Sequence, residues 1–302
     1  MTLPRGGGGG GRRRLRALTR HLVLHGDGAA AETWPLLVTP PASVGDSEAA
    51  IETPALVVEL DVLEANLRKM SALASSFGVA LRPHFKMHKC PSIALQQVEM
   101  GAIGLCCQKV DEAVVMAKAG IRNILVSNEV VAPSKLDRLC ALVPHLEWLG
   151  VCADCTQGVD AIEAACARAG CSLDVLVELD FDAPAGLEDV PFGGGYQRCG
   201  IKGPKLVALA QHICAQPHLT FGGLQAYYGK AQHVRDYDER KAAIDTAAAQ
   251  VQVARDALRA VGIECPKISG GGTGTAAMEA ESGLWNELQA GSYHANCRNT
   301  TI

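Results

Sequence analysis

The sequence predicts an α/β fold, a (β/α)8 TIM-like barrel. Eight short apolar runs of strand length recur along the chain, and segments with helical periodicity separate most of them. Parallel strands joined through helices close into a barrel when eight such units follow one another. A doubly wound open sheet shows the same alternation and is the alternative at this point. The eight strands are expected near residues 79–84, 103–107, 123–127, 147–152, 173–180, 219–226, 265–269 and 286–289.

Start signals mark several of the other elements. Thr53-Pro54 precedes a further expected strand at 55–60, and Asp61 follows that strand as the expected cap of a helix. The apolar side chains of this helix fall on one face: Leu63, Leu67, Met70 and Leu73. Further helices are expected at 134–142, 159–169, 204–215 and 238–261.

Composition excludes several classes of function. With 302 residues and 48% hydrophobic content, the chain can bury a large core in one big domain or two modest ones. A net charge of −4, with five Phe, three Trp and five Tyr, argues against nucleic acid as a partner. No apolar run reaches the length of roughly 18 residues that a membrane span needs, so no membrane partner is expected.

The twelve cysteines are scattered through apparent core strands and helices, where they are expected to be reduced, small apolar residues. Cys152-Ala153-Asp154-Cys155 has the spacing of a metal or redox pair, but no second Cys-x-x-Cys or His pair follows it. His294 and Cys297 are isolated in the same way. The sequence therefore predicts no metal site.

The first 50 residues differ from the rest of the chain. Residues 1–26 contain no acid, a run of six glycines and several arginines, a composition shared by organelle transit peptides and by disordered basic tails. We expect a disordered leader over 1–50, a barrel over 51–293 and a divergent tail over 294–302. The expected location is the cytoplasm, or a mitochondrion or plastid if the leader is a transit peptide.

Two segments suggest a shared chemistry. Lys86 lies in a basic cluster, 82–89, directly after an apolar run, and Gly270-Gly271-Gly272-Thr273-Gly274 follows another short strand. Bare backbone N–H groups of such a loop can wrap an anion, and a lysine can bind an aldehyde covalently if it is kept as the free base, here with help from the neighbouring cations Arg82 and Lys89. An aldehyde with a phosphate tail needs both, which suggests pyridoxal phosphate.

Each segment also has an ordinary interpretation. A Lys-x-x-Lys loop is typical of a solvated surface, and the glycine run suits a flexible turn or the sugar-phosphate loop of a different barrel. In a barrel, however, chemistry gathers at the carboxyl ends of the strands. Polar residues stand at such ends: Lys86, Asn128, Glu129, Asp154, Arg198, Gln225, Tyr227 and Tyr293.

Seven segments, in order along the chain, carry a resemblance to a known family: 53–57, 82–89, 127–131, 198–200, 224–227, 269–275 and 287–293. From about Thr53 to Tyr293 the chain resembles the D-threonine aldolase and D-serine dehydratase-like family. These are pyridoxal phosphate enzymes built on a barrel of the alanine racemase N-terminal type.

The resemblance implies roles for individual residues. Lys86 would hold the cofactor as a Schiff base, with His84 and His88 orienting it or moving a proton. Arg198 would face the ring hydroxyl, and Gln225 and Tyr227 would lie by the ring. The phosphate would be held by Gly271, Gly272, Thr273 and Tyr293. Packing alone is an equal interpretation for the two histidines, and Gln225 equally suits a structural hydrogen bond at the rim.

Three departures from the family pattern matter. Met87 replaces a threonine beside the lysine, and the segment 181–197 is enlarged. Family members also continue beyond the barrel with a β-rich domain that carries a His-x-Cys metal pair. We expect this chain to lack most of that domain, and hence the ligands of the divalent metal expected for the family.

The expected function is a pyridoxal phosphate-dependent lyase acting on D-3-hydroxy amino acids, with D-threonine aldolase-like cleavage to glycine and an aldehyde. The alternatives are a D-serine dehydratase-like ammonia-lyase and a catalytically impaired protein that only binds the cofactor. The expected partner is a small D-amino acid, and the complete family form is expected to be a homodimer.

Overall fold

The computed structural model describes residues 42–43, 45–181 and 199–295, and the chain divides into two compact units, Met1–Glu59 and Leu60–Ile302. The described part of the first unit holds one short 3-10 helix, η1 (Glu48–Ala50). Arg198, Cys297 and nearly all of the enlarged segment 181–197 lie outside the described residues. No helix within the described ranges is long and apolar enough to cross a membrane.

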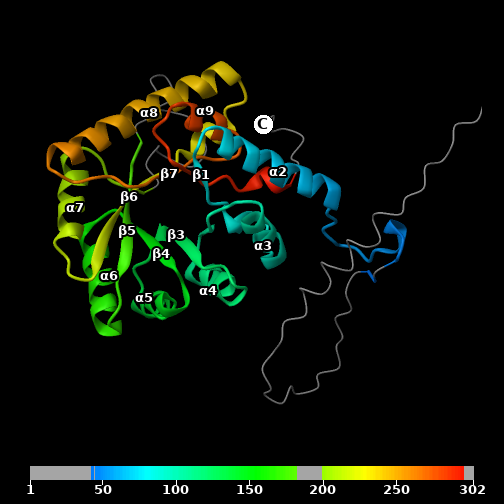
Figure 1. Ribbon diagram of the computed structural model, residues 1–302, viewed down its shortest axis with the longest axis horizontal. Coiled ribbons are helices and arrows are strands. Elements are labelled where there is room, and N and C mark those ends of the chain that lie inside the picture. The colour runs from blue at the N-terminus through cyan, green and yellow to red at the C-terminus, as the bar shows by residue number, and fades with distance from the viewer. Residues whose placement is uncertain (1–41, 44, 182–198, 296–302) are drawn as a thin grey trace, which may run out of the picture. The chain divides into compact units, whose positions relative to one another are not determined.

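The second unit is built on eight parallel strands (Figure 1). They lie in the order β1-β8-β7-β6-β5-β4-β3-β2, and the two end strands meet where Cys106 N donates to Pro83 O at 2.9 Å. All eight expected strands are confirmed, and this sequential order excludes the open doubly wound sheet. The strands are β1 (Ala80–Leu81), β2 (Leu105–Cys107), β3 (Asn123–Glu129), β4 (Trp148–Ala153), β5 (Leu173–Glu178), β6 (Leu219–Ala226), β7 (Ile268–Gly270) and β8 (Glu287–Leu288).

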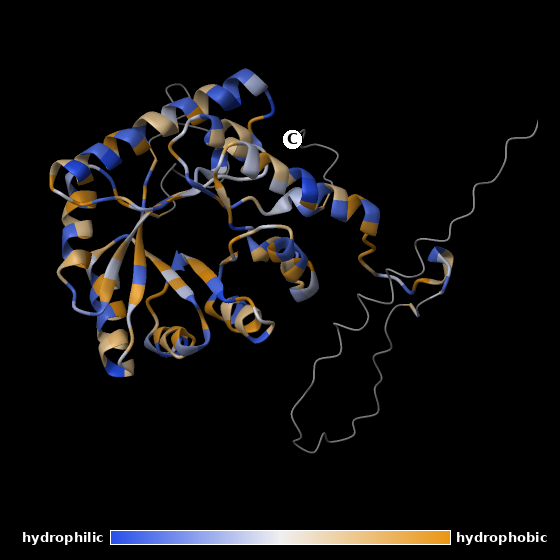
Figure 2. Ribbon diagram, in the orientation of Figure 1, coloured by the Kyte–Doolittle hydropathy of each residue, from blue (hydrophilic) through white to orange (hydrophobic). Residues whose placement is uncertain are grey.

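Amphipathic helices cover the outside of the strands (Figures 1 and 2). Proline occupies the first turn of α3, α5 and α7, and the Asp236 carboxylate caps α8 by accepting from Glu239 N at 2.9 Å. The helices are α2 (Leu60–Ser76), α3 (Pro91–Glu99), α4 (Val110–Lys118), α5 (Pro133–Cys140), α6 (Thr156–Ala169), α7 (Pro204–Cys214), α8 (Tyr237–Ala260) and α9 (Ala276–Glu281).

The prediction of a strand at 55–60 is wrong. Residues 55–59 have no regular structure, and α2 already begins at Leu60. Asp61 therefore lies inside the first turn of α2, where its charge faces the positive end of the helix dipole, and does not precede the helix as a cap. No described strand pairs with 55–59, and an extended segment without a partner leaves its backbone groups to water.

The interior of the barrel holds only a small apolar layer. Cys106, Leu125, Cys152 and Leu176 form a buried cluster separate from the main core, with Trp148 packed against it. The main core lies between the strands and the helices and includes Leu63, Leu67 and Met70 of α2. Several polar side chains on the strands and at their ends are also buried, among them Arg82, Ser269 and Glu287, so hydrogen bonds and ion pairs must hold them in place.

A buried guanidinium dominates this polar interior. Arg82 is 1% exposed, and its Nε lies 2.8 Å from Oε1 of Glu287 on β8. Arg82 also donates to Asn123 Oδ1 at 2.6 Å, and its guanidinium carbon lies 4.6 Å from the centre of the Trp148 ring. This one side chain therefore contacts groups on β3, β4 and β8.

We expect Arg82→Met to lower the free energy of unfolding by about 3–5 kcal/mol, because Glu287 would keep its charge in the barrel without a counter-ion. Urea denaturation measures the change. The double variant Arg82→Met/Glu287→Met should recover most of the loss. Arg68→Met, which breaks the exposed pair of Arg68 with Glu64, should cost under about 1 kcal/mol. Equal losses in the single and double variants would contradict the buried-pair explanation.

Candidate functional site

Four neighbouring strands bring most of the predicted site residues to one sector of the barrel mouth. The strands β1, β8, β7 and β6 are consecutive in the sheet, and at their carboxyl ends stand Lys86, Tyr293, the glycine loop 271–274, and Gln225 with Tyr227. The lysine Nζ lies 5.7 Å from the centre of the Tyr227 ring. The lysine and the glycine loop are thus on the same face, with β8 between their strands.

Lys86 is held by the backbone of a short 3-10 helix, η2 (Phe85–Met87). His84 precedes this helix, and its Nδ1 accepts from Lys86 N at 3.4 Å. The other ring nitrogen, Nε2, lies 3.1 Å from Ser127 Oγ on β3. A neutral ring that accepts at Nδ1 carries its proton at Nε2, so His84 donates to Ser127. Ser127 is a site residue that the strand pattern did not single out.

The two cations that flank Lys86 in the sequence are engaged elsewhere. Arg82 pairs with Glu287 inside the barrel. Lys89 has a side chain 64% exposed, and its Nζ lies 4.0 Å from Glu112 of α4. Arg82 and Lys89 were expected to help keep Lys86 as the free base. Their ion pairs do not support this expectation, because a cation already paired with a carboxylate acts weakly on a third group.

His88 is part of a hydrogen-bonded chain that leads to Tyr293. Its Nδ1 accepts from Cys90 N at 3.1 Å, and its Nε2 lies 3.2 Å from Gln97 Oε1. Gln97 Nε2 in turn donates to the Tyr293 hydroxyl at 3.0 Å. Burial, together with His294 nearby, lowers the pKa of His88 to about 4, so the ring is neutral near pH 7. Gln97 lies on α3, and no sequence motif marks it.

The glycine loop has no space for side chains at two of its positions. Gly271 has φ +82°, and a Cβ there would lie 2.5 Å from Glu279 Oε2. A Cβ on Gly272 would lie 2.3 Å from the amide carbon of Gln232. Within the described residues, Thr273 Oγ1 is buried and has no hydrogen-bond partner. A buried hydroxyl without a partner is costly, and it indicates a place for a polar ligand.

Two further side chains support this loop. Gln232 Oε1 accepts from Gly274 N at 2.8 Å, and Gln232 Nε2 donates to Thr275 Oγ1. Thr275 Oγ1 also donates to Glu279 Oε2 at 2.9 Å. Glu279 of α9 is fully buried, and this burial raises its pKa to about 8. At neutral pH the loop therefore stands on an uncharged carboxyl group, which does not repel an anion bound above it.

Gln225 ends a hydrogen-bonded series that begins at Arg82. Glu287, the partner of Arg82, accepts from Ser269 Oγ at 2.5 Å. Ser269 accepts from Gln289 Nε2 at 2.7 Å, and Gln289 and Gln225 exchange two amide hydrogen bonds of 2.6 and 3.1 Å. The proton positions follow from the carboxylate, which can only accept. The hydrogen bonds with Gln289 thus fix the orientation of the Gln225 amide.

The opposite side of the mouth carries two acids. Asp154 accepts from Gly200 N at 3.2 Å, and Glu178 accepts from Cys199 Sγ at 3.8 Å. These contacts hold the chain directly after Arg198 against β4 and β5.

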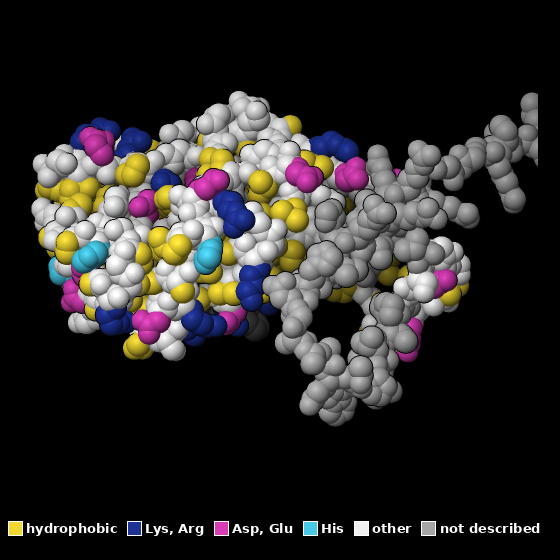
Figure 3. Space-filling view, turned by 60° about the horizontal axis from the view of Figure 1, so that its bottom comes forward, with side chains coloured by type: hydrophobic (Ala, Val, Ile, Leu, Met, Phe, Trp, Pro, Cys, Tyr) yellow, Lys and Arg dark blue, Asp and Glu magenta, His cyan; other side chains and the backbone are white. Residues whose placement is uncertain are grey.

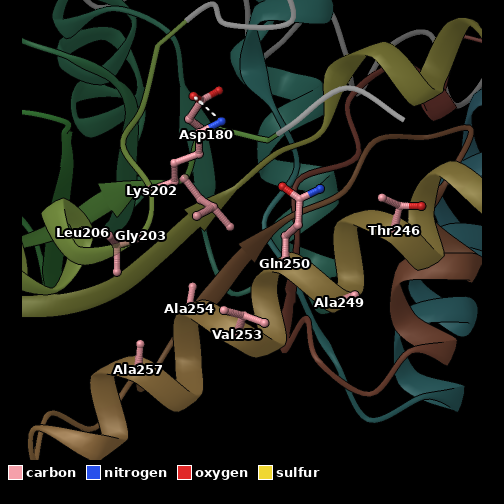
Figure 4. Close-up of a pocket in the computed structure, with 11 residues that line it drawn as sticks. Asp180, Lys202, Gly203, Leu206, Thr246, Ala249, Gln250, Val253, Ala254 and Ala257 are labelled. Carbon is pink, nitrogen blue, oxygen red and sulfur yellow. Dashed lines mark ion pairs between the residues drawn. The ribbon is translucent and has the colours of Figure 1, made fainter. Parts of the chain in front are cut away.

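A pocket of about 430 Å³ lies between the chain after β5, α7 and α8 (Figure 4). It is lined by Leu206 of α7, by Val253 and Ala254 of α8, and by the ion pair of Lys202 with Asp180. None of the predicted site residues lines it. The outer surface in Figure 3 carries acidic and basic side chains intermixed, with no field of one sign that would attract nucleic acid.

The comparisons with known proteins agree with this geometry. Residues 58–294 match the family described as alanine racemase, N-terminal domain. The chain is 45% identical over 259 residues to a D-threonine aldolase of Arthrobacter sp., and 42% identical over 255 residues to a 3-hydroxy-D-aspartate aldolase of Paracoccus denitrificans. These matches cover 85% and 84% of the chain, but 65% and 62% of the two relatives.

Among solved structures, D-threonine aldolase from Filomicrobium marinum superimposes with a TM-score of 0.79 and 43% identity. The match covers 88% of this chain and 69% of that protein. The family assignment rests on three findings. They are the barrel, the lysine and the glycine loop on one face of it, and the similarity along most of the chain. The chain belongs to the alanine racemase N-terminal domain family.

Proposed function

We propose that this chain is the cofactor-binding barrel of a pyridoxal phosphate-dependent lyase that cleaves D-3-hydroxy amino acids to an amino acid and an aldehyde. The observation that carries the proposal is the placement of Lys86 and the glycine loop, with the unpartnered Thr273 hydroxyl, on one face of the barrel mouth. The names of two relatives, D-threonine aldolase and 3-hydroxy-D-aspartate aldolase, support the reaction and the substrate class.

The residues present fit this cofactor. Gly271 and Gly272 let Glu279 and Gln232 pack directly against the loop, and Thr273 Oγ1 offers a donor that no described group uses. The Tyr293 hydroxyl accepts from Gln97, so its own proton is directed elsewhere and can go to a phosphate oxygen. Lys86 supplies the amine for the aldehyde carbon, and the Tyr227 ring lies beside it. Arg198 keeps its proposed place at the ring hydroxyl.

When bound, pyridoxal phosphate withdraws electrons from the Cα of an attached amino acid and so weakens the bonds at that carbon. The side chains of the barrel position the reacting groups. His84 fixes the backbone of Lys86, and the series from Arg82 to Gln289 fixes the amide of Gln225. The neutral His88 holds Gln97, which orients the Tyr293 hydroxyl.

The metal expected from the resemblance has no fit at the mouth. Among the described residues, the group with three metal-ligating side chains in reach of one another is Cys140 on α5, Cys166 on α6 and Cys171 just after α6, and not at the carboxyl ends of the strands. We therefore derive no step through a metal there. The activity proposed here refers to the complete protein, because the chain spans 65% of the D-threonine aldolase that it matches.

Incubation of the protein with D-threonine and pyridoxal phosphate should yield glycine and acetaldehyde, with L-threonine as the control that stays unreacted. Divalent metal is added in parallel samples. Release of ammonia and a 2-oxo acid from D-serine would favour the dehydratase alternative. A bound cofactor without turnover would favour a binding-only protein, and a protein without visible absorption in the presence of the cofactor would contradict the proposal.

The variant Lys86→Ala should lose the visible absorption of the lysine-bound cofactor while phosphate binding partly persists, because the glycine loop stays intact. Lys89→Ala is the matched control and should keep the absorption, since Lys89 is exposed and pairs with Glu112. Borohydride reduction followed by peptide mass mapping identifies the modified lysine. Modification of Lys89 in the unaltered protein would show that the attachment point is wrong.

The variant Thr273→Val should weaken pyridoxal phosphate binding roughly 10- to 100-fold, because it removes a hydrogen bond to a charged phosphate worth about 1.5–3 kcal/mol. Fluorescence titration measures the affinity. The cofactor-free variant should be as stable in urea as the unaltered protein or more stable, since the hydroxyl that it loses has no partner among the described residues. A loss of stability without a loss of affinity would assign Thr273 to the fold alone.

The variant Glu279→Gln should flatten one part of the pH dependence of stability. Glu279 has an ordinary pKa of 4.5 and a folded-state pKa of about 8, so between these values the folded protein holds a proton that the unfolded chain releases. The unaltered protein should therefore lose stability relative to the variant as pH rises from 4.5 to 8, by up to about 1.4 kcal/mol per pH unit. Urea unfolding at several pH values measures this, and parallel curves would contradict a buried neutral carboxyl.

A further inference from the structure

Three cysteine thiols converge on the outside of the barrel. Cys140 ends α5, Cys166 lies in the last turns of α6, and Cys171 follows that helix. Their Sγ atoms all lie within 4.8 Å of one another, and those of Cys140 and Cys166 are 3.9 Å apart. Cys140 and Cys166 are buried, whereas Cys171 is partly exposed. In the sequence these residues are 26 and 5 positions apart, so no short motif reveals them.

The local structure holds the three thiols in place. Gly170 ends α6 in the left-handed conformation, with φ 62°, and turns the chain back so that Cys171 N donates to Cys166 O at 3.1 Å. Asp137 of α5 and Arg168 of α6 form an ion pair of 2.7 Å between the same two helices. The thiols are thus fixed by two helix ends and a turn, and not by a flexible loop.

We propose that Cys140, Cys166 and Cys171 form a thiolate site for one Zn²⁺ ion, with solvent as the fourth ligand. A tetrahedral zinc ion with Zn–S bonds of about 2.3 Å holds its sulfur ligands roughly 3.8 Å apart, close to the separation of Cys140 and Cys166. The third thiol has to approach by less than about 1 Å to complete the set. Its partial exposure gives water access to the fourth position.

Binding converts three thiols to thiolates and releases three protons to solvent, so the complex with Zn²⁺ carries one negative charge. Arg168 and Asp137 both lie close enough to act electrostatically on Cys140, with opposite signs, and they pair with each other at 2.7 Å. Cys140 Sγ and Cys166 Sγ lie within hydrogen-bond distance of each other, at 3.9 Å.

The place of the site indicates a structural effect. Cys140 ends its helix, and Cys171 comes just before β5 begins at Leu173, so the thiols lie at the amino ends of the strands. The barrel mouth is at the carboxyl ends. Zinc here would join α5 to α6 and stabilise the fold without contact with the cofactor site.

The test uses the full chain, reduced and stripped of metal with a chelator. Titration with Co²⁺ should produce a thiolate-to-cobalt charge-transfer band that saturates at one ion per chain and disappears on addition of Zn²⁺. Zn²⁺ should also raise the unfolding temperature, because it binds the folded state.

The variant Cys171→Ala should weaken Zn²⁺ binding at least tenfold and abolish the rise in unfolding temperature. Because Cys171 is partly exposed, its replacement leaves the core in place. Cys214→Ala, which removes an exposed thiol on α7, is the matched control and should bind Zn²⁺ as the unaltered protein does.

Three results would overturn the proposal. They are the absence of a cobalt band in reduced protein, a band that survives in Cys171→Ala, and binding of Cu⁺ without binding of Zn²⁺, since Cu⁺ accepts three thiolates without a fourth ligand. Competition with a Cu⁺-specific chelator distinguishes the last case.

Discussion

The charge of Arg82 at the centre of the barrel is the constraint on which the remaining polar interior depends. A guanidinium cannot lose its proton in a protein, so its neighbours must supply a carboxylate and acceptors. Glu287 and Asn123 do so. Because the Glu287 carboxylate can only accept hydrogen bonds, Ser269 donates to it. Gln289 therefore turns its amide nitrogen toward Ser269. A single fixed charge thus determines the orientation of groups on β7 and β8 and of Gln225 on β6.

The closure of the sheet and the placement of Lys86 depend on the same short segment. His84 bridges to Cys106 of β2 at the seam of the barrel, and its ring holds both the backbone of Lys86 and the hydroxyl of Ser127. A displacement of β1 relative to β2 would therefore move the lysine. This coupling explains how a residue just beyond a two-residue strand can be held firmly enough for chemistry at the mouth.

Much of the fold could be predicted from the sequence because strand and helix periods are local properties. All eight strands are confirmed, and barrel order predicts that Lys86, Tyr227 and the glycine loop lie on the same face. The prediction of a strand at 55–60 is wrong, since an apolar run alone does not reveal whether a neighbouring strand exists to pair with it. Gln97, Gln232 and Glu279 were not identified because each acts through a contact with a residue distant in the chain. Cys140, Cys166 and Cys171 escaped for the same reason, whereas the suggestive Cys152 lies in the barrel interior and Cys155 precedes α6.

The bond between Gln97 and Tyr293 joins residues 196 positions apart, and β8 enters the sheet between β1 and β7. A nascent chain that has emerged only as far as α8 has already made the lysine segment, yet it lacks the glycine loop and the strand that separates the two. The anion-binding half of the proposed site thus comes into being only when synthesis is nearly finished. An unfinished chain would then lack the loop that is proposed to hold the phosphate.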